Sequence, residues 1–457
     1  MYPLFEFPVA GAGIIIALIA TFHILPCHLA TGGFWMVYFF ERRAHADGNR
    51  ELLDYLKHFA LMVLIFCFVL GSITGVGIWF SSTIISPRAI SGLIHNYVWG
   101  WATEWVFFLI EIVTIYVYYY TFDKVSPRTH MRIGLMYALA AWLSMVIITG
   151  ILAFMMTPGK WLETGGFFDG FFNPTYWPQL LYRTMMMLAI AATFAAVMAG
   201  FMKPGETRTY VVKTAGRWGL AGLLLGALFG AWYYFKLPAP AHEVLATLPY
   251  VQFMFRLSLI IGFIMAVYFG GLLLGWTRLV KPVVAISMVV VLFLGIGGGE
   301  SVREFSRRPW LIPGVMYSNQ VIAHDLTAKG VKSELAVYQK KGFLAENYFV
   351  PEAWRKIDRD NYLKAGMLLT KVNCSICHTM EVNGRNSLPR LIQEMGISSA
   401  ADLADFMSTI GDDYSYMPAF AGNDVERRAA AAWMASIVPG NESEPPTPEW
   451  VLNGDGD

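Results

Sequence analysis

The run Cys374-Ser375-Ile376-Cys377-His378 brings two thiols and an imidazole together within five residues. Cysteines at this spacing attach a c-type haem by adding across its vinyl groups, and the histidine that follows them binds the iron. The spacing puts Cys374, Cys377 and His378 on one short turn against one face of the porphyrin. Such attachment takes place on the oxidising side of a bacterial membrane, so we expect this turn to lie in the periplasm.

The residues around this run resemble a small class I cytochrome c over roughly residues 360–438. A predicted helix precedes the run and a loop with Leu388-Pro389 follows it. Tyr416-Met417-Pro418 then comes before a last predicted helix that carries Trp433. The resemblance implies that the Pro-containing loop packs against His378 and that Met417 is the second iron ligand. A thioether ligand raises the haem potential, which suits electron transfer. Packing in the core is the alternative for Met417.

Two acidic residues lie within a strongly apolar stretch, where a charge is costly and therefore indicates a function. Glu104 and Glu111 are seven residues apart, which is about two turns of a helix, so both carboxylates lie on one face. Carboxylates at two depths suit a proton relay, or a haem contact with a proton carrier beneath it. A pair of structural, hydrogen-bonded acids is the alternative. We take Glu104 and Glu111 as candidate catalytic residues.

Another apolar stretch contains Phe22-His23-Ile24-Leu25-Pro26-Cys27-His28. A histidine in such a stretch is a good haem ligand. The two histidines are five residues apart, about 140° around a regular helix, so they cannot share one small ligand site unless Pro26 bends the helix. We expect His23 to bind the iron of a membrane haem. The alternative for either histidine is a hydrogen bond to a neighbouring helix.

Charged residues cluster at the end of the last apolar stretch. Glu300 is followed by Arg303, Glu304, Arg307 and Arg308. Arginine binds carboxylates through paired hydrogen bonds, so the cluster is a candidate clamp for haem propionates, and we take Glu300 and Arg307 as candidate cofactor-binding residues. A solvated, charged helix end is the alternative.

The composition requires a membrane to hold these residues. Of 457 residues, 56% are hydrophobic and 15% are charged, whereas a soluble domain has about 25% charged residues. Four cysteines are too few for a disulfide framework. A span needs about 20 apolar residues, and we count eight such stretches. They are roughly residues 9–40, 59–81, 97–121, 131–156, 179–201, 217–236, 251–276 and 282–299.

The basic residues of the connections predict the orientation of the chain. Lys and Arg concentrate in the odd-numbered connections, which are therefore cytoplasmic. They are Arg42, Arg43, Arg50, Lys57, Lys124, Arg128, Arg132, Lys203, Arg208, Lys213, Arg217, Arg278 and Lys281. We expect a multi-pass protein of the bacterial inner membrane, with a periplasmic N-terminus and a periplasmic C-terminal domain. The chemistry of haem attachment points to the same side independently.

The predicted fold is all-α, a polytopic bundle of eight transmembrane helices followed by a small periplasmic helical domain. Residues 1–300 form the bundle in this prediction. Residues 301–359 are mixed and charged and predict a periplasmic linker with short helices. Residues 360–440 predict the cytochrome c domain. Residues 441–457 are rich in Pro and acidic residues and predict a disordered tail.

The eight predicted spans resemble, in order, subunit I of the cytochrome bd oxygen reductases. The order and spacing of several short pieces make the match moderately specific. These pieces are His23 with Glu41, Gly71-Ser72-Ile73-Thr74-Gly75, Glu104 with Glu111, Leu143-Ser144 through Pro158, Phe255-Arg256, and Arg307-Arg308-Pro309-Trp310. The resemblance implies two high-spin haems near the outer surface and a low-spin haem beside a quinol site. It also implies that His23 binds a high-spin haem, with Glu104 beside it and Glu111 on the proton path.

The chain departs from that family at its low-spin haem. Arg183 aligns with the family's histidine ligand and Ser258 with its methionine ligand. The long quinol loop is reduced to Lys236–Leu248, and Gly297 aligns with a haem-binding glutamate that Glu300, one turn away, would replace. The usual ninth span is replaced by the cytochrome c domain.

These features predict a respiratory haem protein with one covalent haem c and at least one haem b or d in the membrane. In one hypothesis it is an oxidoreductase, a bd-like oxidase that reduces oxygen with electrons from cytochrome c. The alternatives are a non-catalytic electron-transfer subunit of a larger complex and a quinol:cytochrome c electron carrier. Expected partners are other membrane subunits, a periplasmic electron donor or acceptor and the lipid bilayer. The net charge of +1 and the lack of a basic tail argue against nucleic acid.

Overall fold

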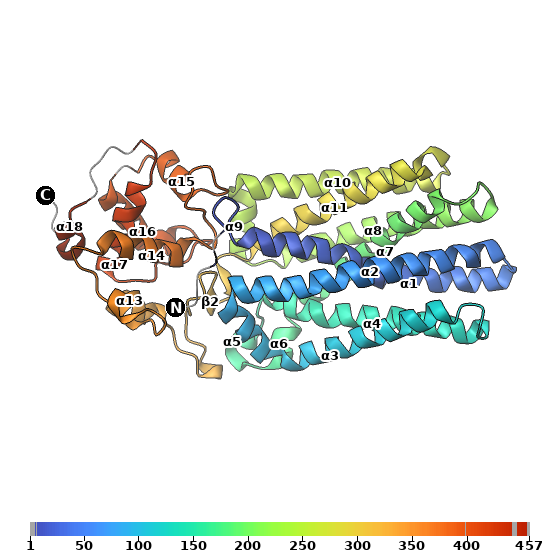
Figure 1. The fold of residues 1–457 in the computed structure, drawn as a ribbon, viewed down its shortest axis with the longest axis horizontal. Helices are drawn as coiled ribbons and strands as arrows, with labels where there is room; N and C mark the ends of the chain where they lie inside the picture. The colour runs from blue at the N-terminus through green and yellow to red at the C-terminus, as the bar shows by residue number, and fades with distance from the viewer. Residues whose placement is uncertain (1–4, 6, 398, 441–445, 455–457) are drawn as a thin grey trace.

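An elongated helical bundle carries a smaller helical domain at one end (Figure 1). The computed structural model describes residues 5, 7–397, 399–440 and 446–454. Eight helices of this described part are long and apolar enough to cross a membrane, which confirms the predicted number of spans. They are α1 (Gly13–Asp47), α2 (Arg50–Ile85), α3 (Pro87–Tyr120), α4 (Pro127–Phe154), α7 (Tyr176–Gly200), α8 (Glu206–Phe235), α10 (Pro249–Leu273) and α11 (Pro282–Ser306). The near end of the bundle meets the C-terminal domain, and the far end is opposite.

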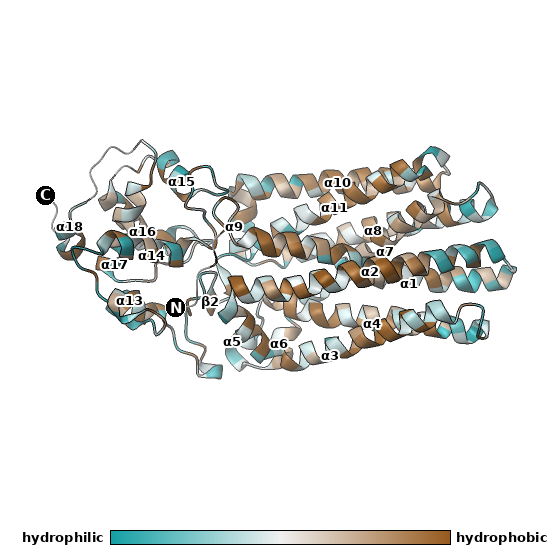
Figure 2. Ribbon diagram, viewed as in Figure 1, coloured by the Kyte–Doolittle hydropathy of each residue, from teal (hydrophilic) through white to brown (hydrophobic). Residues whose placement is uncertain are grey.

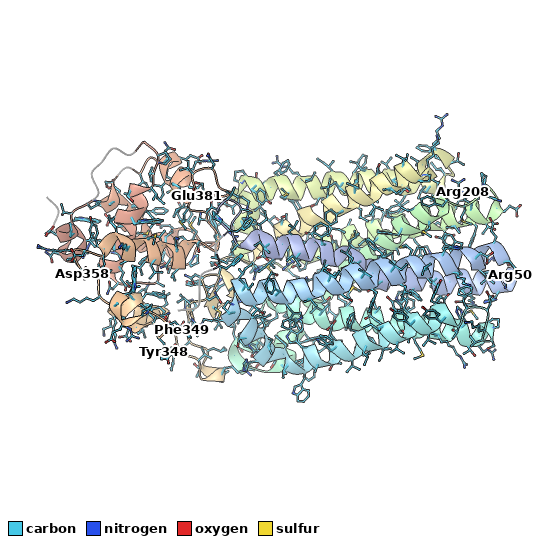
Figure 3. All side chains as sticks on the ribbon, viewed as in Figure 1. Arg50, Arg208, Tyr348, Phe349, Asp358 and Glu381 are labelled. Carbon is cyan, nitrogen blue, oxygen red and sulfur yellow. The ribbon has the colours of Figure 1, made fainter. Side chains whose placement is uncertain are left out.

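Turn chemistry sets the helix ends at the far end of the bundle. After α1, Gly48 has a φ of +66°, a conformation that favours glycine. The side chain of Asn49 then caps α2 by accepting a hydrogen bond from the N–H of Leu52 at 2.9 Å. Apolar residues predominate along the helices, and hydrophilic residues occupy the far-end turns (Figure 2). Arg50 and Arg208 lie at this end (Figure 3). The bundle therefore has a polar far end joined by short connections.

The first helix is the centre of the bundle. It contacts α2, α4, α7 and α11. In its far half, Leu29, Phe34 and Val37 are fully buried. Residues on α1 therefore reach the interior of the bundle wherever they point away from lipid.

Short elements close the near end and form the linker. Near the bundle they are α5 (Trp161–Thr164), α6 (Phe167–Phe171) and α9 (Ala239–Thr247), with the 3-10 helix η1 (Thr277–Val280) at the far end. The linker contains β1 (Trp310–Ile312), β2 (Met316–Tyr317), η2 (Thr327–Lys329), α12 (Leu335–Lys341), α13 (Phe343–Glu346) and η3 (Glu352–Trp354). The antiparallel pair β1–β2 was not predicted, because strands of two or three residues show no periodicity.

The C-terminal domain has a core of its own. Its helices are α14 (Tyr362–Cys374), α15 (Leu388–Glu394), α16 (Ala400–Asp413), α17 (Asp424–Ser436) and α18 (Pro448–Asn453). The closest contact is between α14 and α17, where a methyl group added to Gly366 would lie 2.0 Å from the carbonyl oxygen of Ala429. The two helices can cross at this distance only because residue 366 has no side chain.

The tail differs from the prediction of disorder over residues 441–457. Pro448–Asn453 forms α18, and Val451 is fully buried against α17. The guanidinium of Arg428 donates to the carbonyl of Val451 at 2.9 Å. Composition alone predicted disorder, but one buried apolar residue and one hydrogen bond hold this segment. Residues 441–445 and 455–457 lie outside the described part.

We expect Gly366→Ala to destabilise the C-terminal domain by about 1–3 kcal/mol, because the added methyl forces α14 and α17 apart. The readout is the thermal unfolding midpoint of the purified full chain. Gly262→Ala is the matched control, since no atom lies within 4 Å of a methyl added there. An unchanged midpoint for Gly366→Ala would contradict the importance of this crossing.

Candidate functional site

The C-x-x-C-H run begins at Cys374, the last residue of α14, and its cysteines and histidine lie on one turn, as the spacing predicts. The N–H groups of Cys377 and His378 both donate to the carbonyl of Cys374, at 3.1 and 2.9 Å. Both thiols are free and half-buried. The side chain of Asn373 accepts a hydrogen bond from the N–H of Ala421 at 2.9 Å. This contact, which sequence reasoning missed, ties the turn to the segment before α17.

The imidazole of His378 is oriented for binding a metal through Nε2. Its Nδ1 lies 3.2 Å from the carbonyl oxygen of Asn386, and a carbonyl only accepts, so Nδ1 carries the proton. The Asn386 amide also lies 3.2 Å from Nδ1, but donates to the Cys377 carbonyl at 2.7 Å. Burial lowers the pKa of His378 to about 4, with a further contribution from the charge of Arg308. A neutral histidine with a free Nε2 is the form that binds iron, so these residues fit a c-type haem.

The loop between α16 and α17 carries Met417. Its N–H donates to the carbonyl of Tyr414 at 2.9 Å. The neighbouring Tyr416 packs against an apolar cluster of the bundle formed by Val244, Val251 and Phe305. The described residues include no direct contact between Met417 and His378, so Met417 as the second ligand stays a prediction. Leu388 and Pro389 were expected in a loop but begin α15, because the Ser387 side chain caps this helix. The residue that contacts His378 is Asn386, in the segment before α15.

The C-x-x-C-H turn rests on the near end of the bundle. The carbonyl oxygen of Ile376 lies 3.5 Å from where a side chain on Gly13 would begin, at the first turn of α1. The thiol of Cys377 lies 4.0 Å from the hydroxyl of Ser318 in the linker. A small cavity of about 20 Å³ separates the two domains here. Its lining includes Gly13, Ile16, Arg307, Arg308, Ile376 and Cys377.

The charged end of α11 is buried at this junction, which contradicts the alternative of a solvated helix end. Glu300 pairs with Arg303 at 2.9 Å, and Glu304 accepts two hydrogen bonds from Arg307. The Nη1 of Arg307 is buried and has no hydrogen-bond partner among the described residues. A buried, unpaired donor of a cation is costly unless an anion meets it. Arg307 therefore fits a carboxylate such as a haem propionate, whereas Glu300 is already held by Arg303.

Several contacts dock the C-terminal domain on the bundle. The N–H and Nε of Arg385 donate to the carbonyls of Val9 and Ala10, at 2.7 and 3.0 Å. Its guanidinium lies over the rings of Tyr250 and Phe305, 5.9 and 5.6 Å from their centres. On the linker, Arg88 of α3 pairs with Glu334 through two hydrogen bonds of 2.7 and 2.9 Å. The domain is therefore fixed on the bundle at several points.

His23 lies within the bundle on α1, half-buried and facing α2. Its Nδ1 is 3.1 Å from the hydroxyl oxygen of Thr74, whose own proton goes to the carbonyl of Leu70 at 2.6 Å. Thr74 therefore accepts from Nδ1–H, which leaves Nε2 with a lone pair. The thiol of Cys27 lies 3.3 Å from Nε2. The thiol therefore donates to this lone pair, and iron would take its place. Sequence reasoning missed both Thr74, which accepts from Nδ1–H, and Cys27.

His28 has a different environment. It is buried, and its Nδ1 donates to the carbonyl of Ile24 on its own helix at 3.0 Å. The structure therefore separates the two histidines, as the angle between them predicts. His28 bonds to its own backbone rather than to the neighbouring helix that the alternative interpretation expected.

The two acids of α3 lie on one face, as predicted. Glu104 accepts a hydrogen bond from the hydroxyl of Ser144 on α4 at 3.0 Å. Glu111 lies two turns further along the same face of α3 and is half-buried. Both carboxylates therefore point toward the interior between α1, α3 and α4, on the side where His23 lies.

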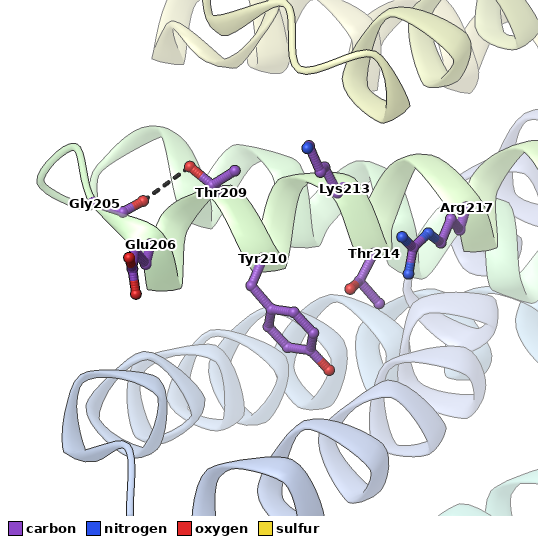
Figure 4. A pocket seen from close by; sticks show the side chains of 7 residues that line it. All are labelled: Gly205, Glu206, Thr209, Tyr210, Lys213, Thr214 and Arg217. Atoms are coloured by element: carbon purple, nitrogen blue, oxygen red, sulfur yellow. Dashed lines mark hydrogen bonds between the residues drawn. The ribbon is translucent and has the colours of Figure 1, made fainter. Parts of the chain in front are cut away.

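A surface cavity of about 540 Å³ is remote from these residues. It lies on the far-end part of α8 and is lined by Gly205, Glu206, Thr209, Tyr210, Lys213, Thr214 and Arg217 (Figure 4). The only bond drawn there joins the hydroxyl of Thr209 to the carbonyl of Gly205. All of its lining residues belong to α8 or directly precede it, and none of the predicted site residues borders it.

We expect Arg385→Ala to loosen the docking of the C-terminal domain, because it removes a side-chain bond to the N-terminal segment and two ring contacts. Hydrogen–deuterium exchange should rise at residues 9–16 and 374–386 and stay unchanged within α16. Arg390→Ala is the control, since Arg390 bonds only within its own domain, to the Val382 carbonyl. Equal exchange in both variants would show that Arg385 does not hold the interface.

Known proteins resemble the bundle. Residues 12–234 match the family model of cytochrome bd terminal oxidase subunit I. The structure is similar to that of the bd oxidase from Geobacillus thermodenitrificans, with a TM-score of 0.59 and 16% sequence identity over 71% of this chain and 91% of that chain. No curated protein matches the chain. Over residues 12–234 the chain is therefore similar to subunit I of cytochrome bd terminal oxidase, and its helical bundle has the fold of a bd oxidase.

Proposed function

We propose that this chain is a haem-bearing subunit of a respiratory oxidase in a bacterial inner membrane. It takes electrons from a periplasmic donor through a covalent haem c and passes them to a membrane haem b or d, where oxygen is reduced. One observation carries the proposal: the C-x-x-C-H turn rests on the first turn of α1, the helix that also carries His23. The two candidate haem sites are thus connected through one rigid element.

The haem c would be held by Cys374, Cys377 and His378, with Met417 as the second axial ligand. A bound haem supplies one-electron transfer and, in the membrane, a site for oxygen. Asn386 keeps Nε2 of His378 free for iron. Because the C-x-x-C-H turn faces the bundle across a small cavity, electrons have a short way from the C-terminal domain to α1.

The membrane haem would be held by His23, with Arg307 or Arg308 on its propionates. Ile16, which lines the junction cavity with Arg307, is two turns before His23 on the same face of α1. Thr74 orients the His23 ring through Nδ1. Glu104, hydrogen-bonded to Ser144, and Glu111 carry protons from within the bundle, because reduction of oxygen to water consumes one proton for each electron.

The near end faces the periplasm in this proposal, since the basic connections lie at the far end. The N-terminus and the C-terminal domain are then both periplasmic. Large apolar side chains such as Val76, Phe263 and Val283 are exposed on the outside of the bundle. They suit contact with lipid or with other membrane subunits of a respiratory complex.

Electron transfer without oxygen chemistry is the second candidate. It is favoured by the position of Ser258, which aligns with the family's methionine ligand and whose hydroxyl is bonded to the carbonyls of Met254 and Gly295 at 3.0 and 3.4 Å. A chain that lacks a haem ligand of the family would bind fewer haems and would therefore store fewer electrons for the reduction of oxygen. A quinol:cytochrome c carrier has no comparable observation in its favour.

Purified chain with its native partner subunits should show one c-type and at least one b- or d-type haem in a pyridine haemochrome spectrum. It should also consume oxygen when reduced through the haem c. Full haem content without oxygen consumption would favour the electron-transfer subunit instead. Oxidation of added quinol in place of cytochrome c would support the quinol carrier.

We expect His23→Ala to lose the b- or d-type absorbance and keep the c-type absorbance. Thr74→Val should keep the haem but alter its iron–histidine stretching frequency in resonance Raman spectra, because Nδ1 loses its acceptor. Thr74→Ser restores a hydroxyl and should restore the wild-type frequency. Identical spectra for all three Thr74 forms would contradict the role of Thr74, and unchanged haem in His23→Ala would contradict the ligand assignment.

A further inference from the structure

A buried carboxylate at the far end of α1 is the centre of a cluster that the proposed electron route does not use. Glu41 is completely buried. One of its oxygens lies 2.6 Å from Nδ1 of His130 on α4, and the other accepts a hydrogen bond from the hydroxyl of Tyr118 on α3 at 2.9 Å. His45, one turn further along α1, lies 3.6 Å from Glu41 and is partly exposed. The cluster therefore links the far-end surface to the interior.

The hydrogen bonds of this cluster require a shared proton. Nε2 of His130 lies 2.9 Å from the carbonyl oxygen of Tyr118, which only accepts, so Nε2 carries a proton. Nδ1 then either has a proton of its own, which it donates to Glu41, or accepts one from a protonated Glu41. In both cases the contact of 2.6 Å between Glu41 and His130 holds one exchangeable proton. Tyr118 donates its own proton to the second oxygen and cannot supply this one.

The cluster is also the end rung of a polar ladder between α3 and α4. On α3, Glu104, Glu111 and Tyr118 follow one another at intervals of seven residues, and on the antiparallel α4, Ser144, Tyr137 and His130 do the same. The outer rungs are the hydrogen-bonded pairs Glu104–Ser144 and Tyr118–His130. Glu111 and Tyr137 occupy the matching middle positions of the two helices. Seven residues of a helix rise by about 10 Å. Polar groups at this spacing therefore cross the apolar bundle along one face.

We propose that Glu41, His130 and Tyr118 form the entrance of a proton path that runs along this ladder to Glu111 and Glu104. A proton from water at the far end enters past His45 and replaces the shared proton, which moves toward Tyr137 and Glu111. The pair therefore returns to its starting charge after each transfer. This inference rests on the proposed oxygen reduction, which consumes the protons.

Few other charged groups face the cluster. Phe122 covers His130, with ring centres 4.7 Å apart, and the ammonium of Lys57 on α2 lies over the far side of Phe122, 5.7 Å from its centre. Arg43 is held by Asp47 on the surface. Within the described residues, Lys57 and His45 are cationic groups close to this cluster, and neither is directly hydrogen-bonded to His130.

The test uses the complete oxidase reconstituted in vesicles, with Glu41→Gln as the variant. Glutamine keeps the shape and hydrogen bonds of the site but does not carry a proton. Thr207→Val is the matched control, because Thr207 is a buried far-end residue whose hydroxyl contacts the Asn49 side chain at 3.1 Å and which takes no part in the Glu41 cluster. Haem spectra and the thermal midpoint are recorded first, so that a variant with disturbed folding is recognised. If Glu41→Gln does not fold normally, His130→Gln is the second variant, because it removes the histidine that shares the proton with Glu41.

We expect Glu41→Gln to slow oxygen consumption about tenfold or more and to slow proton uptake from the far side equally, measured with a pH dye. Electron transfer from haem c to the membrane haem without oxygen should be unchanged, as should both rates in Thr207→Val. Wild-type rates of oxygen consumption and proton uptake in both Glu41→Gln and His130→Gln would show that this cluster is not the entrance of the proton path. The proposed function would be unaffected by that result. A wild-type protein with full haem content and no oxygen consumption would overturn the proposed function, and the proton path with it.

Discussion

The first four helices of the bundle are held in register by hydrogen bonds to polar and ionisable groups that they bury. Charge in an apolar interior is costly unless a partner meets it. In this bundle the partners come from neighbouring helices: His23 contacts Thr74, Glu104 contacts Ser144, and Glu41 contacts His130 and Tyr118. Each pair joins two or three helices, so the polar groups also fix how α1, α2, α3 and α4 face one another.

The same requirement holds at the junction of the two domains. The end of α11 buries a network of arginines and glutamates, and one guanidinium nitrogen of Arg307 has no partner among the described residues. The backbone of the C-x-x-C-H turn approaches α1 closely because Gly13 has no side chain. The C-terminal domain is thus a docked part of the molecule, and the linker and Arg385 hold it there.

The fold follows largely from the amino-acid sequence. Apolar length alone is enough to predict eight spans, because backbone hydrogen bonds inside a bilayer must be made within each helix. The C-x-x-C-H spacing likewise determines one turn, since only a few bonds separate its residues. Composition failed for the tail, because the burial of Val451 is a long-range contact that acidity and Pro content do not reveal.

What the sequence by itself determined are the local features: helices, the attachment turn, and the separation of His23 from His28 around α1. The tertiary structure alone decided the partners. Thr74, Asn386 and His130 lie 51, 8 and 89 residues from the groups they bind, and nothing in their neighbouring residues marks them. The ladder between α3 and α4 likewise depends on how two antiparallel helices are rotated toward each other. That rotation is set by the packing of side chains from distant segments, which no local pattern specifies.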